Sequence, residues 1–342
     1  MISKIATGPI IVLFAGILQG VYAVPMKFAK RWNYENIWLL FAANALVVFP
    51  WALTVWTVPH LGAVYRATPI TTLVAIAGFG LCWGIGVALI GLGLNMLGIG
   101  LGFAVILGLS ASVGSLIPLF VLNPEKIGTY QGHVYMFGTA IMLLGVSCGA
   151  RAGFLRDKGE KAVTQQGDSS RSSFFTGLLI VTVAGLLSSS LNFCYAFGGA
   201  AMAAAEAHGA SPVYSSNVIT SLATTGGFVG TLIYCGYLLW KNSTTRLFWS
   251  SGAGWNWFCG FVMAVCWFGG QAMYGLGSTR SGDLGTVVSW PLLMGMIIIT
   301  SNVAGFLTGE WDATSRRSRV YLCCSMVLIL VALGVLALGH GA

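Results

Sequence analysis

Four side chains in one apolar stretch of this sequence are suited to bind a sugar. They are spaced at i, i+4, i+7 and i+11, on one stripe of a helix, and are Trp267, Gln271, Tyr274 and Ser278. An indole ring can cover the apolar face of a sugar ring, while amide and phenol groups pair with sugar hydroxyls. The alternative is that Gln271 bonds only to a neighbouring helix.

The stripe lies in a segment that occurs twice. Cys82-Trp83 and the glycines that follow match Cys266-Trp267 and its glycines in register. The two copies differ on the stripe, where Val87, Ile90 and Leu94 of the first copy correspond to Gln271, Tyr274 and Ser278 of the second. Since apolar residues satisfy packing in the first copy, the polar replacements indicate a function for this face.

Other apolar stretches carry similar polar faces, with Asn192 and Tyr195 in one and Gln19 and Tyr22 in another. Buried amides elsewhere are more typical of contacts between helices. The predicted substrate-binding residues are Gln271, Tyr274, Trp267, Trp83, Asn192, Tyr195, Gln19, Tyr22, Trp290, Asn217 and Asn302.

The composition requires that these stretches cross a membrane. Hydrophobic residues make up 56% of the 342 residues and charged residues 8%, against roughly 25% charged in soluble domains. Continuous apolar runs exclude a β-barrel, and an unpaired backbone is too costly in lipid for anything but helices. The sequence predicts an all-α polytopic membrane protein with ten spans, near 7–28, 35–58, 71–95, 99–121, 130–150, 173–198, 213–240, 254–277, 282–308 and 319–339.

Charge placement predicts the orientation of these spans. Most Lys and Arg side chains fall in loops on one side, which the positive-inside rule assigns to the cytoplasm. Both termini are then periplasmic, and the net charge of +8 needs no nucleic-acid partner. A polar linker at 151–172 separates repeats at 1–150 and 173–342. Five spans in each repeat is an odd number, so the second repeat is inverted, as in secondary transporters.

Several short strings resemble those of the bacterial L-rhamnose–proton symporter family, a branch of the drug/metabolite transporter superfamily. They are Pro25-Met26-Lys27, Trp32, Glu35, Trp38, Pro50-Trp51-Ala52, Trp83-Gly84-Ile85-Gly86, Arg151-Ala152-Gly153, Gln271, Tyr274, Ser289-Trp290, Glu310-Trp311 and Arg316-Arg317. The resemblance implies an inner-membrane carrier that imports L-rhamnose or a related deoxy-sugar with protons, sodium being the alternative ion. Val87-Ala88-Leu89 departs from the polar stretch of rhamnose carriers, which leaves the exact sugar open.

Two other classes compete with a sugar importer. A drug or metabolite exporter of the same superfamily would need a mostly aromatic pocket and little use for Gln271 and Asn192. An intramembrane enzyme would need catalytic or metal-binding residues close together, but the four histidines lie apart near span ends. We therefore expect a transporter without cofactor or metal, acting as a monomer.

Charged residues near span ends are the candidates for coupling and gating, because no acidic residue lies at the centre of a predicted span. Asp283 opens the ninth span, and Lys27 and Glu35 flank the first loop. Pro25 is expected to break the first helix, and Pro291 to interrupt the ninth.

Asp283→Asn should leave sugar binding intact and abolish proton-driven accumulation, because an amide cannot carry the proton. The measurement is sugar uptake into vesicles driven by a pH gradient, with sugar counterflow as the control for binding. Normal pH-driven accumulation in this variant would contradict the assignment.

Overall fold

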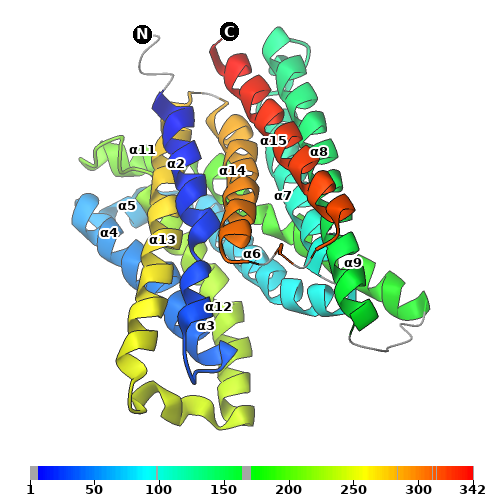
Figure 1. Ribbon diagram of the computed structural model, residues 1–342. Helices are drawn as coiled ribbons and strands as arrows, with labels where there is room; N and C mark the ends of the chain where they lie inside the picture. Colours follow the sequence, from blue (N-terminus) through cyan, green and yellow to red (C-terminus); the bar gives the residue numbers. More distant parts are fainter. Residues whose placement is uncertain are drawn as a thin grey trace.

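The computed structural model describes residues 7–97, 99–163, 171–282, 284–309, 311–312 and 314–341. The first residues of α2 and the last of α15 lie at the same end of a helical bundle (Figure 1). The α-helices are α2 (Thr7–Val21), α3 (Tyr34–Ala43), α4 (Phe49–Thr57), α5 (Leu61–Ala67), α6 (Ile70–Leu97), α7 (Ile99–Leu122), α8 (Tyr130–Val163), α9 (Arg171–Ser188), α10 (Ser190–Phe197), α11 (Gly199–Ala207), α12 (Asn217–Asn242), α13 (Ala253–Arg280), α14 (Gly285–Leu307) and α15 (Arg316–Gly341). Shorter turns are the 3-10 helices η1 (Val24–Phe28), η3 (Pro124–Lys126) and η4 (Thr244–Trp249) and the π-helix η2 (Asn44–Val48).

Ten helical segments in the described residues are long and apolar enough to cross a membrane, which confirms the predicted fold class. Three of them contain breaks: the first joins α2 to η1, the second joins α3 to α4 through η2, and the sixth runs from α9 to α11. Large apolar side chains such as Leu144 and Ile233 are 61% and 68% exposed. Such a surface is stable in lipid rather than in water.

Two local predictions differ from the structure. α8 continues to Val163, well into the predicted linker, because residues 154–163 are mostly good helix formers; residues 164–170 lie outside the described residues. The predicted interruption at Pro291 is wrong, since α14 is continuous through it. The break at Pro25 is found, because α2 ends at Val21 and η1 follows.

Prolines inside α7 and α14 leave helix carbonyls that neighbouring side chains satisfy. Pro118 and Pro291 have no N–H to donate to the carbonyls four residues earlier, at Gly114 and Val287. The Ser115 hydroxyl donates to the Val287 carbonyl over 2.6 Å. The Gly114 carbonyl is paired by a side chain of α10 that belongs to the candidate site. These bonds join α7 to α14 and to α10.

Helix contacts follow the predicted repeat. α2 packs against α13 and α14, and α9 packs against α6 and α7. Since the repeat pairs α2 with α9, α6 with α13 and α7 with α14, exchanging the halves converts one set of contacts into the other. α8 and α15, the last helix of each half, pack against each other. These contacts support the inverted repeat, which stays a prediction.

Glycines let α6 and α12 approach each other closely. A Cβ added at Gly84 would lie 2.5 Å from the carbonyl oxygen of Gly227, and one at Gly226 would lie 2.8 Å from that of Ala77. The facing atoms belong to the backbone, which cannot move out of the way of a Cβ as the end of a flexible side chain can. Small residues at such contacts are how membrane helices gain packing energy, so α6 and α12 form one tightly packed pair.

Gly84→Ala should therefore destabilise the protein by about 1–3 kcal/mol through overpacking. Gly78→Ala on the same helix is the matched control, because a Cβ there meets nothing within 4 Å and alanine is the better helix former. The measurement is the midpoint of thermal unfolding in detergent. Equal midpoints for the two variants would contradict the close contact.

Candidate functional site

A cavity of about 690 Å³ lies among helices of both predicted repeats, within the range of roughly 300–1,000 Å³ typical of small-molecule sites. We call it the central cavity. Its lining consists of Gln19, Tyr22, Met26, Tyr34, Trp38, Trp83, Val87, Ala88, Ile90, Ile106, Leu107, Ser110, Ser188, Leu191, Thr231, Tyr234, Trp267, Gln271, Trp290 and Met294. Six candidate residues from four different spans thus meet here: Gln19, Tyr22, Trp83, Trp267, Gln271 and Trp290.

The two tryptophans of the repeated segment stack on each other in this cavity. The Trp83 and Trp267 ring centroids are 5.6 Å apart and their planes are inclined by 23°. On one side the Trp83 ring lies against Gly227, where a Cβ would overlap ring carbons. The pair gives the cavity a fixed, flat aromatic surface of the kind that covers the apolar face of a sugar ring.

A chain of side-chain hydrogen bonds crosses the bundle beside this stack. Gln19 Nε2 donates to Gln271 Oε1 over 3.0 Å and to the Trp267 carbonyl over 3.4 Å. Gln271 Nε2 donates to the Tyr195 hydroxyl over 3.0 Å, and that hydroxyl pairs with Thr220 Oγ1 at 2.8 Å. An amide has two N–H donors and two acceptor lone pairs. Gln271 uses one of each in these contacts, so half of its capacity is left for a ligand.

A second hydrogen-bonded pair of side chains, Tyr274 and Asn192, lies beside this chain of hydrogen bonds. The Tyr274 hydroxyl donates to Asn192 Oδ1, and Asn192 Nδ2 donates to the carbonyls of Gly114 over 2.8 Å and Thr286 over 3.2 Å. The Tyr274 ring meets Tyr195 edge to face at 5.3 Å. We call these side chains the polar layer: Gln19, Gln271, Tyr195, Tyr274 and Asn192. All of them are buried.

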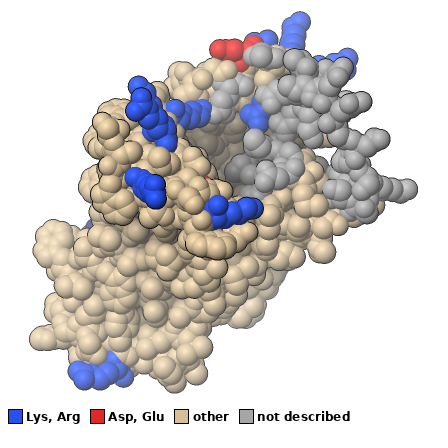
Figure 2. Space-filling view, turned by 90° about the horizontal axis from the view of Figure 1, so that it is seen from below, with Lys and Arg blue, Asp and Glu red and all other residues tan. Residues whose placement is uncertain are grey.

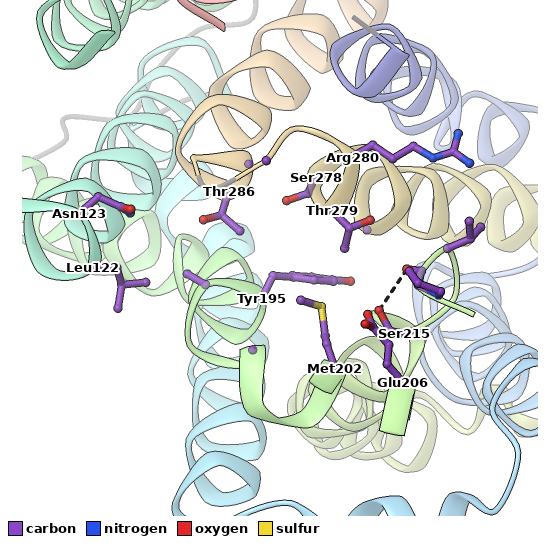
Figure 3. Close-up of a pocket in the computed structure, with 17 residues that line it drawn as sticks. Leu122, Asn123, Tyr195, Met202, Glu206, Ser215, Ser278, Thr279, Arg280 and Thr286 are labelled. Carbon is purple, nitrogen blue, oxygen red and sulfur yellow. Dashed lines mark hydrogen bonds between the residues drawn. The ribbon is translucent and has the colours of Figure 1, made fainter. Parts of the chain in front are cut away.

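A second pocket, of about 490 Å³, is lined by Tyr195 of the polar layer and by the end of α13 (Figure 3). The end of α13 lies against Gly8, near the start of α2. We call this second pocket the terminal pocket. Its lining consists of Leu122, Asn123, Tyr195, Ala196, Gly199, Met202, Glu206, Pro212, Val213, Ser215, Gly275, Ser278, Thr279, Arg280, Gly282, Gly285 and Thr286. It shares no described lining residue with the central cavity. The stripe on α13 therefore runs from the central cavity at Trp267 to the terminal pocket at Ser278.

The central cavity opens at the end of the molecule opposite the termini. That end is hollowed, with Lys and Arg side chains around the opening (Figure 2). Tyr34 and Tyr234, which line this part of the cavity, are 42% and 44% exposed. Tyr34 stacks on Trp38 with ring centroids 5.3 Å apart. The molecule is open at one end and closed by the polar layer toward the other.

Several polar and aromatic side chains that line the cavity are not among the predicted substrate-binding residues, namely Tyr34, Trp38, Ser110, Ser188, Thr231 and Tyr234. Tyr34 and Trp38 are four residues apart, and Thr231 and Tyr234 are three apart. Each pair thus forms a helical stripe of the type used for the other candidates. A search for stripes in the second and seventh spans would have found them.

Two candidate asparagines lie away from the cavity. Asn217 Nδ2 donates to Thr57 Oγ1 over 2.9 Å, and Asn302 Nδ2 donates to the Ile298 carbonyl of its own helix over 2.8 Å. Neither lines the central cavity or the terminal pocket. Asn217 thus joins two helices, and Asn302 bonds to a carbonyl one turn earlier in its own helix.

The coupling and gating candidates lie near helix ends. Lys27 Nζ donates to Thr308 Oγ1 over 2.7 Å, which ties η1 to the end of α14. Glu35 Oε1 accepts bonds from Asn242 Nδ2 over 3.0 Å and Thr244 Oγ1 over 2.8 Å, which ties α3 to the end of α12. Asp283 lies outside the described residues. Both described candidates therefore join helix ends at the open end of the molecule.

The central cavity is suited to a neutral ligand. Its described lining contains neither an acidic nor a basic side chain, and no histidine. Within the described ranges, no group of three or more His, Cys, Asp or Glu residues is placed to hold a metal ion. Recognition in such a cavity depends on hydrogen bonds and aromatic surface.

Asn192→Leu should lower the stability by about 1–3 kcal/mol, because the Tyr274 hydroxyl and the Gly114 carbonyl would lose a buried partner. The measurement is again the thermal unfolding midpoint. Asn302→Leu is the matched control, since this half-buried amide bonds only within its own helix, and its midpoint should barely change. Equal losses in both variants would contradict the role of Asn192.

Known proteins are similar to this chain over nearly its whole length. A family model described as L-rhamnose-proton symport protein matches residues 1–342. An L-rhamnose-proton symporter of Shigella flexneri is 25% identical over 325 residues, with 93% of each chain covered. Two L-rhamnose-proton symporters of Escherichia coli, from O1:K1 / APEC and strain 55989 / EAEC, are 24% identical over 325 and 335 residues with the same coverage. The chain therefore belongs to the L-rhamnose-proton symport protein family.

Proposed function

We propose that this protein imports L-rhamnose or a closely related deoxy-sugar together with protons across the bacterial inner membrane. The relatives are named L-rhamnose-proton symporters, and membership of this family makes the chain a transporter rather than an enzyme. The observation that carries the sugar assignment is the Gln19–Gln271 amide pair beside the stacked Trp83 and Trp267 rings.

The lining of the central cavity favours a deoxy-sugar. Seven aromatic side chains line it: Tyr22, Tyr34, Trp38, Trp83, Tyr234, Trp267 and Trp290. Apart from the tyrosine hydroxyls and tryptophan N–H groups, the polar groups of the described lining come from Gln19, Ser110, Ser188, Thr231 and Gln271. L-Rhamnose carries a methyl group where a hexose carries a hydroxymethyl group. A hexose would bury one more hydroxyl against mainly apolar surface, and an unpaired buried hydroxyl is costly.

Transport proceeds by alternating access between the two inverted repeats. The basic open end faces the cytoplasm by the positive-inside rule, which places both termini in the periplasm and makes this conformation inward-facing. Opening to the other side requires the polar layer to separate, above all the Gln271–Tyr195 bond. The halves then rock around a sugar held at the tryptophan stack.

Protons drive accumulation in this proposal, with Asp283 as the group that carries them. Lys27 and Glu35 act as gating residues, because their bonds to Thr308, Asn242 and Thr244 hold helix ends together at the cytoplasmic opening. Sodium is the alternative driving ion, and the monomer is the proposed transport unit.

Export of drugs or amphipathic metabolites is the second candidate function. Its support is the aromatic share of the cavity lining. Family membership favours sugar import, and so does the amide pair, since amphipathic drugs do not need a buried amide with half of its hydrogen-bonding capacity unused.

Gln271→Ala should abolish saturable uptake of L-rhamnose while the protein still reaches the membrane, because both the ligand contact and the bond to Tyr195 are lost. Uptake of radiolabelled sugar and the thermal shift caused by L-rhamnose measure this. The shift reports binding to the native state.

Asn302→Ala is the control for Gln271→Ala and should transport normally, since Asn302 lies outside both pockets. Undiminished uptake in the Gln271 variant would overturn the site assignment. A thermal shift with drugs but not with deoxy-sugars would favour the exporter instead.

A further inference from the structure

The terminal pocket contains chemistry that the proposed transport site does not use. It lies where α10, α11, α13 and α14 end or begin, and Tyr195 lies across its middle (Figure 3). Glu206 extends into it from α11, while the Arg280 side chain runs away from Tyr195 (Figure 3). Glu206 thus gives this pocket a carboxylate, in contrast to the uncharged described lining of the central cavity.

Two hydroxyls in the lining of the pocket, those of Ser215 and Thr279, present hydrogen-bond acceptors. Thr279 Oγ1 donates to the Leu276 carbonyl over 2.9 Å, and Ser215 Oγ donates to the Pro212 carbonyl over 3.1 Å. Each hydroxyl therefore uses its single O–H donor on a backbone carbonyl and keeps its lone pairs as acceptors. Together with the Glu206 carboxylate, they present acceptors to a ligand that supplies donors.

This arrangement fits a neutral polyhydroxy ligand. The described lining holds one acidic and one basic side chain, Glu206 and Arg280, so it favours neither an anion nor a cation. An apolar ligand would leave these charges and the hydroxyls desolvated without partners. A sugar supplies several O–H donors, and bonds to a carboxylate are roughly twice as strong as those between neutral groups. The Tyr195 ring and Met202 supply apolar surface for the sugar ring.

The pocket is separated from the central cavity by the polar layer, and Tyr195 is the member of this layer that lines the pocket. The Tyr195 hydroxyl bonds to Gln271, which lines the central cavity, while Tyr195 itself lines the terminal pocket. Tyr274 fills the space beside it and is fully buried. A ligand in one space cannot touch the lining of the other while this wall is closed.

We propose that the terminal pocket is a second monosaccharide site, in which Glu206 and Thr279 hold the sugar before the Gln271–Tyr195 bond opens. This rests on the proposed function in that it takes the transported sugar as ligand. A sugar docked here lies against the residue whose movement joins the two spaces, so the site collects substrate on the side from which it enters.

Equilibrium binding of radiolabelled L-rhamnose to the purified full chain in nanodiscs tests this proposal. The wild type should bind two sugars per chain at saturation. Gln271→Ala should remove the site in the central cavity, and Glu206→Ala should weaken the terminal-pocket site, raising its dissociation constant about tenfold or more. Thr279→Val should weaken the same site by removing only a hydroxyl.

Glu125→Ala is the matched control for the loss of a carboxylate. Glu125 is exposed and belongs to η3, which follows Leu122 and Asn123 of the pocket rim, but it does not line the pocket. This variant should still bind two sugars. A wild-type stoichiometry of one that Glu206→Ala leaves intact overturns the second site and leaves the proposed function standing. Absence of any binding by the wild type overturns the proposed function and this proposal with it.

Discussion

A carbonyl that loses its helical partner inside a membrane must find another donor, and the arrangement of this bundle depends on that constraint. Pro118 frees the Gly114 carbonyl, and Asn192 supplies the replacement donor. Asn192 is then held in place to accept from Tyr274. Two members of the polar layer, Asn192 and Tyr274, are thus held next to a missing backbone bond in α7.

The sequence predicts the fold class and the ten spans well, because both depend on local apolar content and on chain length. It also includes all five polar-layer residues among its candidates, since residues such as Gln271 and Asn192 stand out against apolar surroundings on a helical stripe. The stacking of Trp83 on Trp267 requires the two similar segments to meet in the folded chain. The repeat pairs the two tryptophans in sequence but does not place their rings in contact.

Other parts of the site depend on how helices pack, which the sequence does not state. Tyr234 lines the central cavity from α12, which the glycines of α6 bring close, whereas Tyr34 lines it from the start of α3. Asn302 has the same chemistry as Asn192, but it lies on a face turned away from both pockets. The effect of Pro291 was also non-local, because a serine on another helix compensates for it.

The difference between the two repeats has a consequence for the resting state. The polar layer uses Gln271 and Tyr274, whose counterparts in the first repeat are Val87 and Ile90. An equivalent closure at the opposite end would therefore lack these hydrogen bonds. On the proposed mechanism the two conformations differ in free energy, and the unloaded carrier populates the one that is open to the basic side. Substrate that binds from the other side must then supply this free-energy difference. Its apparent affinity is lowered in proportion to the fraction of carriers that are open to that side.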